Sequence, residues 1–92
     1  MSDIQIGENK FFIEKDGKEA AVITYYHDNN SNIVIDHTGV SEDLREQGIG
    51  KELVASVVDK ARAENKKIIP ECPYAEKQLK DNEAYHDVLA TA

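Results

Sequence analysis

The chain has 92 residues, of which 40% are hydrophobic and 32% charged, a balance typical of one small folded domain rather than of a disordered chain. A domain of this size hides only about 60–65% of the surface that its unfolded chain exposes, so a modest core leaves little room for a deep cavity. The formal net charge of −7 argues against binding of nucleic acid or of an anionic membrane, since both need a basic protein surface.

Neither a membrane segment nor a metal site is predicted. The chain contains no run of 18 apolar residues, and its first residues lack the basic and apolar segments of a signal peptide. Cys72 is the single cysteine and cannot form an internal disulfide, and the three histidines do not stand at the spacing of zinc ligands. We therefore expect one domain over residues 1–92, cytoplasmic, without a metal, and present as a monomer or weak dimer.

The first half of the chain predicts antiparallel strands. Residues 10–15 and 19–26 are rich in aromatic and β-branched residues, and Asp16-Gly17 between them is typical of a two-residue hairpin turn. A turn of short polar residues at 27–32 leads into a third strand at 33–40. These three strands predict an antiparallel meander.

The second half predicts a helix between two parallel strands. Apolar residues recur at helical spacing over 49–65, and a short strand follows at 67–71, where Pro70 favours an edge position. Together with the third strand, these elements can form a right-handed βαβ unit. A short helix is expected to begin at Pro73, and residues 83–89 are expected to add one more turn. The predicted fold class is α+β, with helices packed on a small mixed sheet.

Two glycines, Gly48 and Gly50, stand where the loop after the third strand enters the long helix. Glycine lets a backbone approach a ligand closely, and the first amides of a helix have no partners within it, so this turn suits phosphate or pyrophosphate. A tight turn without a ligand would explain the same two residues. The spacing fits neither a P-loop nor a dinucleotide fingerprint, because Arg45, Glu52 and Leu53 occupy positions that those motifs reserve for other residues.

The segment Arg45-Glu46-Gln47-Gly48-Ile49-Gly50 resembles the Arg/Gln-x-x-Gly-x-Gly/Ala motif of GNAT-type N-acetyltransferases, whose loop holds the pyrophosphate of acetyl-CoA. Glu46 departs from the glycine that is common there and should slightly weaken cofactor binding. The minimal YjdJ-like/NATD-like acetyltransferases are similar also in His37-Thr38-x-Val40 and in Pro70-x-Cys72-Pro73-Tyr74. The resemblance covers residues 10 to 89 and implies a minimal GNAT-like fold.

The resemblance also implies a set of cofactor-binding residues. The strand end at Val40 is similar to the family's strand position whose backbone pairs with the pantetheine arm of acetyl-CoA. The full set expected to bind acetyl-CoA is Thr38, Val40, Arg45, Gln47, Gly48, Ile49, Gly50 and Lys51. The second substrate is expected to be an amine acceptor.

Three side chains are the favoured candidates for the chemistry. His37 is a candidate base, because histidine is the side chain that most often exchanges protons near neutral pH. Cys72 precedes a helix start that can activate a thiol, although it could instead line the pantetheine channel. By resemblance to related acetyltransferases, in which a tyrosine protonates the leaving thiolate, Tyr74 and Tyr85 are both candidates for that role, and Tyr74 is the favoured one. Because parallel strands end at the same edge of a sheet, we expect His37 and Cys72 to share one cleft.

The favoured function is an acetyl-CoA-dependent N-acetyltransferase for an exposed or small amine. The alternative is a non-catalytic module that binds acyl-CoA, and a bare interaction domain is the third hypothesis.

Overall fold

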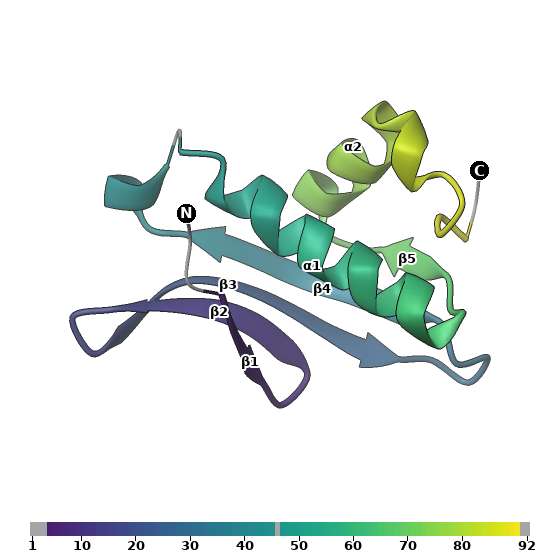
Figure 1. The fold of residues 1–92 in the computed structure, drawn as a ribbon, viewed down its shortest axis with the longest axis horizontal. Coiled ribbons are helices and arrows are strands. Elements are labelled where there is room, and N and C mark those ends of the chain that lie inside the picture. The colour runs from purple at the N-terminus through teal and green to yellow at the C-terminus, as the bar shows by residue number, and fades with distance from the viewer. Residues whose placement is uncertain (1–3, 46, 91–92) are drawn as a thin grey trace.

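The computed structural model describes residues 4–45 and 47–90, which form one five-stranded sheet with helices packed against it (Figure 1). The strands lie in chain order across the sheet, and only the last pair is parallel. The elements are β1 (Gln5–Gly7), β2 (Lys10–Lys15), β3 (Lys18–His27), β4 (Ile33–Val40), α1 (Ile49–Glu64), β5 (Ile68–Pro70) and α2 (Pro73–Asp81), with short 3₁₀ turns at Glu42–Leu44 and Glu83–Tyr85.

The predicted meander is confirmed, and its turns show why it forms. Asp16 and Gly17 both adopt positive φ, 55° and 76°, as a two-residue turn between twisted strands requires. In the turn between β3 and β4, the carboxylate of Asp28 accepts hydrogen bonds from the backbone amides of Asn30 and Asn32, each at 2.9 Å. The structure adds the short strand β1, which the sequence analysis did not predict and which pairs with β2.

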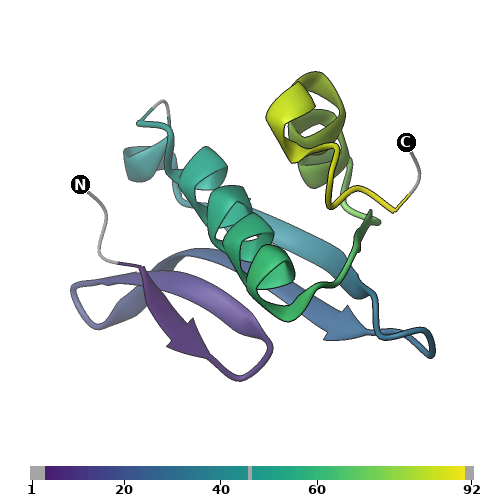
Figure 2. The ribbon, with the colours of Figure 1, turned by 45° about the vertical axis from the view of Figure 1, so that its right-hand side comes forward.

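The βαβ unit is also confirmed. Helix α1 connects β4 to β5 and lies across one face of the sheet. Helix α2 follows β5 and lies beside α1, toward the β5 edge of the sheet (Figures 1 and 2). Asn65 ends α1 in the left-handed conformation, as expected of a C-terminal stop. The core lies between α1 and the sheet, where its largest fully buried side chains are Ile23, Ile33, Ile35, Leu53, Ile68, Leu79, Val54, Val57 and Val58.

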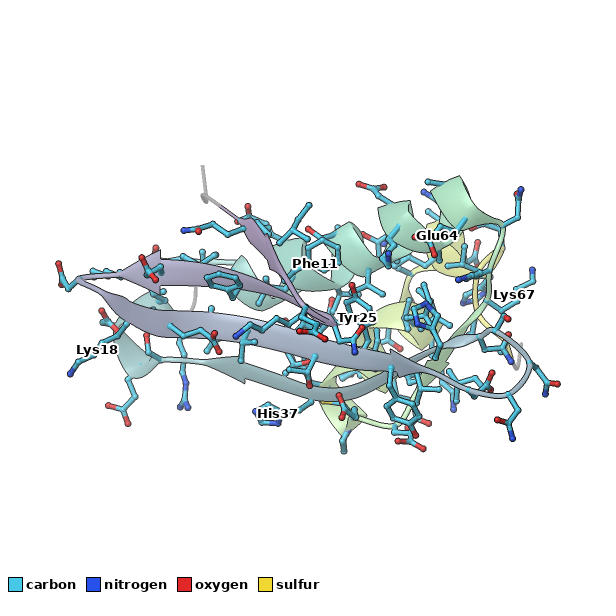
Figure 3. All side chains as sticks on the ribbon, turned by 90° about the horizontal axis from the view of Figure 1, so that it is seen from below. Phe11, Lys18, Tyr25, His37, Glu64 and Lys67 are labelled. Atoms are coloured by element: carbon cyan, nitrogen blue, oxygen red, sulfur yellow. The ribbon has the colours of Figure 1, made fainter. Side chains whose placement is uncertain are left out.

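Strand β4 contains a β-bulge, after which its side chains alternate in the opposite sense between the two faces of the sheet. Thr24 of β3 pairs with His37, but the next residue, Tyr25, pairs with Ile35, so Asp36 has no opposite partner. Without this bulge, His37 would share a face with Ile35. With it, Thr38 faces α1 and His37 projects from the other face, which Figure 3 shows from below.

The pairing of β4 with β5 stops early. It ends at Ile35 opposite Pro70, where the carbonyl of Ile35 accepts the amides of both Glu71 and Cys72 at 2.9 and 3.2 Å. Strand β4 continues to Val40, held by β3 on its other side. Among the described residues, no strand pairs with the β5 side of β4 beyond Ile35. The two strands therefore part and leave a free strand edge beside the start of α1.

Candidate functional site

A cavity of about 500 Å³ lies where β4 runs on past β5 and α1 begins. Four segments far apart in the sequence build its walls, namely the end of β4, the loop that follows, the first turn of α1 and the first turn of α2. The lining residues are Thr38, Gly39, Val40, Leu44, Arg45, Gly48, Ile49, Gly50, Lys51 and Tyr74. This set contains seven of the eight predicted cofactor-binding residues and one of the three predicted catalytic residues.

The first turn of α1 supplies hydrogen-bond donors to the cavity. Gly48 caps the helix in the left-handed conformation, with φ of 76°, and among residues 4–45 and 47–90 no side chain accepts a hydrogen bond there as a cap. An added Cβ at Gly48 would meet no atom within 4 Å, so backbone conformation rather than space requires glycine there. Uncapped amides and the positive end of the helix dipole make this turn suited to an anionic group.

Two cations, Arg45 and Lys51, line the same cavity in a chain whose net charge is −7. Within residues 4–45 and 47–90, no carboxylate forms an ion pair with either of them. The Nε atom of Arg45 instead donates to the carbonyl oxygen of Val40 at 3.2 Å, which holds the guanidinium at the free edge of β4. The cavity is thus a locally cationic site on an acidic protein.

Asp43 braces the loop between β4 and α1. Its carboxylate accepts hydrogen bonds from Lys15 Nζ at 2.9 Å and from Ser41 Oγ at 2.6 Å, and its carbonyl accepts one from Gln47 Nε2 at 3.0 Å. The hydrogen bond from Lys15, together with that from Ser41, lowers the pKa of Asp43 to about 2. Gln47, a predicted cofactor-binding residue, therefore points its side chain back at the loop and does not line the cavity.

Cys72 is not among the lining residues of the cavity, but its thiol contacts one of them. Its side chain is buried at the start of α2, and its Sγ atom is 3.6 Å from Oγ1 of Thr38, which lines the cavity. Burial alone would raise the pKa of the thiol. The nearby backbone amides of Ala75 and Tyr74 and the hydroxyl of Thr38 favour the thiolate, outweigh that effect and lower the pKa of the thiol below its ordinary value.

His37 does not share a cleft with Cys72, contrary to the expectation from the parallel strands. The bulge at Asp36 places His37 on the sheet face away from α1, where its side chain is exposed and does not line the cavity (Figure 3). The rule that neighbouring parallel strands end at one edge holds for their backbones. It does not determine to which face each side chain points, and the bulge decides that here.

Tyr74 lines the cavity from the first turn of α2, and its hydroxyl reaches the first turn of α1. Burial of the ring raises the pKa of this hydroxyl. Gly39 and Leu44 also line the cavity but were not predicted as site residues. The sequence carried a signal for both, since Gly39 stands between Thr38 and Val40, and Leu44 directly precedes Arg45.

Across the described ranges, no three His, Cys, Asp or Glu side chains gather in a way that could hold a metal ion. Neither helix there has the length and apolarity that a membrane crossing requires.

The ion pair between Lys15 and Asp43 generates the first prediction. In Lys15→Met, the pKa of Asp43 should rise from about 2 toward its ordinary value of 3.8, because the largest cause of its lowering is removed. A pH titration of the Asp43 carboxyl carbon by NMR measures this change. Since the pKa is lowered in the folded state, the pair stabilises the fold above pH about 4 and loses this effect as the pH falls toward 2.

Lys18 is the control because it lies in the same hairpin and forms no ion pair within the described residues. Lys18→Met should leave the Asp43 titration unchanged. An equal shift in both variants would show that general charge, not the Lys15 contact, sets the pKa.

The second prediction concerns the thiol. The rate of alkylation of Cys72 should reach half its maximum at a pH below 9.0, and Thr38→Val should move this midpoint upward by removing one partner of the thiolate. Iodoacetamide labelling across a pH series measures both, and Cys72 is the single cysteine that can react. A midpoint that does not respond to Thr38→Val would contradict the assigned contact.

Known proteins are similar to this chain in sequence and in fold. The sequence model described as GCN5-related N-acetyl-transferase matches residues 10–88. A solution structure from Staphylococcus aureus, of a protein assigned to the GCN5-like N-acetyltransferases, shares 45% identity with a TM-score of 0.81 and covers 95% of this chain and 86% of its own. No curated protein sequence was found to match.

Two crystal structures are more distant. One, assigned to the GNAT acetyltransferases of Staphylococcus aureus, shares 26% identity with a TM-score of 0.58 over 64% of this chain and 51% of its own. The other, ribosomal-protein-alanine N-acetyltransferase of Brucella melitensis, shares 24% identity with a TM-score of 0.55 over 90% of this chain and 64% of its own, and it supports the fold alone. The family match and the 45% identical structure show that the chain belongs to the GCN5-related N-acetyltransferase family.

Proposed function

We propose that the cavity binds acetyl-CoA and that the chain transfers its acetyl group to an exposed or small amine. Three features that meet in one cavity support the proposal most strongly. They are the uncapped first turn of α1, two cations without ion-pair partners among the described residues, and the free edge of β4. Family membership supports the transferase chemistry. That the cofactor is acetyl-CoA and that the acceptor is an amine are our proposals.

The cavity offers a different contact to each part of acetyl-CoA. The pyrophosphate suits the amides of the first turn of α1 and the charges of Arg45 and Lys51. The pantetheine arm carries amide groups, and an extended arm with amides can pair with an unpaired strand edge as another strand would. The edge of β4 at Thr38 and Val40 lines the cavity and has no strand partner among the described residues.

Acetyl transfer needs an attacking group, stabilisation of the developing negative charge and a proton for the leaving thiolate. Among the described lining residues there is no Asp, Glu or His, which leaves Tyr74 as the acid within the cavity. We propose that the Cys72 thiolate attacks the thioester carbonyl carbon, forming a new C–S bond as the C–S bond to CoA breaks, while Tyr74 protonates the departing sulfur. The neutral amine then attacks the acetyl carbonyl carbon, forming a C–N bond as the C–S bond to Cys72 breaks, and its proton passes to the Tyr74 phenolate, so that Cys72 is restored as the thiolate.

A second candidate function is a module that binds acyl-CoA without turning it over. The absence of a carboxylate or imidazole among the described lining residues favours it, because an amine acceptor must lose a proton before or during attack. Release of free CoA in the presence of an amine panel supports the enzyme. Tight binding of acetyl-CoA without release supports the module.

The third prediction tests cofactor binding. Gly48→Val places a branched side chain at the turn that faces the proposed pyrophosphate position, and it should weaken acetyl-CoA binding by about tenfold or more. Gly17→Val is a matched control, since Gly17 has the same φ of 76°, also has no neighbour within 4 Å of an added Cβ, and lies in the hairpin turn. Calorimetric titration should show normal affinity for Gly17→Val. Equal affinities of the two variants would refute the assigned site.

The fourth prediction tests the role of Cys72. Exposure to acetyl-CoA should leave one acetyl group on the intact protein, detected by mass spectrometry, and Cys72→Ala should abolish both the adduct and turnover. His37→Ala should leave formation of the adduct unchanged, because His37 lies on the other face of the sheet. A missing adduct together with an active Cys72→Ala variant would remove the nucleophile proposal and leave the cofactor proposal standing.

A further inference from the structure

Gly50 needs an explanation other than backbone conformation. It is buried in the first turn of α1, and its φ is not positive, unlike that of Gly48. An added Cβ at Gly50 would lie 2.6 Å from the hydroxyl oxygen of Tyr74, 2.9 Å from its Cζ and 3.0 Å from its Cε2. Real Cβ atoms do not approach other heavy atoms so closely. While the Tyr74 ring lies there, only glycine fits at this position, because the ring occupies the space of the missing side chain.

We infer that Gly50 is a positioning residue that seats the Tyr74 ring across the first turn of α1, and that the seated ring is a wall of the cavity needed for cofactor binding. The ring comes from the first turn of α2, so the contact joins the starts of the two helices on either side of the cavity. The seating follows from the geometry alone. The consequence for binding rests on the proposed function, because it takes the cavity to be the acetyl-CoA site.

The Tyr74 side chain can respond to a larger residue at position 50 without unfolding the protein. The ring is 40% exposed, and the atoms nearest to an added Cβ are at the far end of the side chain, so rotation about its own bonds can relieve the overlap. Gly50→Ala should thus fold and displace the ring toward solvent. Since burial raises the pKa of Tyr74, displacement should lower that pKa toward its ordinary value of 10.0.

A double-mutant cycle tests the inference. Gly50→Ala and Tyr74→Ala should each weaken acetyl-CoA binding about fivefold or more, and the double variant should bind no more weakly than Tyr74→Ala alone, because the ring that the new Cβ would meet is gone. Tyr74→Phe keeps the ring and should therefore weaken binding less than Tyr74→Ala does. Gly48→Ala is the control, since nothing lies within 4 Å of its added Cβ, so its effect should add fully to that of Tyr74→Ala.

The seating is also measured without a ligand. In the unchanged protein, NMR should detect proximity between the Tyr74 ring protons and the α-protons of Gly50, and in Gly50→Ala the ring resonances should shift and titrate at lower pH. Ring resonances that are unchanged in Gly50→Ala, or full additivity of Gly50→Ala with Tyr74→Ala, would overturn the inference. If the unchanged protein does not bind acetyl-CoA, the proposed function is wrong, and so is the role of the Tyr74 ring in cofactor binding. The measurements without ligand test separately whether Gly50 positions the ring.

Discussion

The parting of β4 from β5 is the constraint on which the candidate site depends. Pro70 has no amide to donate, and the two following amides both converge on the carbonyl of Ile35, which ends the parallel ladder. Strand β4 then continues to Val40 with only β3 beside it. A longer β5 would pair with the edge that now lines the cavity. The same early ending sets Cys72 next to Thr38 and starts α2 where Tyr74 can reach α1.

Local charge, not net charge, governs what this cavity can bind. The chain as a whole carries −7 and repels a polyanion at long range, but charges separated by more than about 8–10 Å are largely screened at physiological salt. Within that range the cavity presents Arg45, Lys51 and the uncapped start of α1. The nearby carboxylate of Asp43 is matched by Lys15 from the β2–β3 hairpin, so it organises the loop and its charge is compensated. The hairpin thereby contributes to a site that it does not line.

The turns and helices that depend on short-range sequence patterns could be predicted from the sequence. The Asp16-Gly17 turn needs positive φ at both residues, and the apolar period over 49–65 needs a buried helix face, so both could be read from the sequence. Strand β1 could not, because three residues without a β-branched run carry no pattern and gain their structure from β2. Of the loop residues that line the cavity, Arg45 and Gly48 were predicted through the glycine spacing and the family resemblance, and Leu44 was not. Gln47 was predicted but does not line the cavity, and only its hydrogen bond to the carbonyl of Asp43 shows where its side chain lies.

Two features of the site needed the tertiary structure. Nothing in the letters Asp36-His37-Thr38 marks which residue bulges, and a shift of one residue exchanges the faces of His37 and Thr38. The contact between Gly50 and Tyr74 joins residues from two different helices, and both glycines of the motif look alike in sequence. The structure separates them, because Gly48 is required by its φ and Gly50 by the ring that lies against it.

We propose that acetyl-CoA binds in the cavity where β4 continues past the end of β5. An NMR titration of the isotope-labelled protein with acetyl-CoA tests it residue by residue. We expect the largest shifts on the amides of residues 48–51, on the strand edge at 38–40 and on the Tyr74 ring, with little change at Tyr26 and His37 on the opposite face. Shifts centred on that opposite face, or no shifts at millimolar acetyl-CoA, would contradict it.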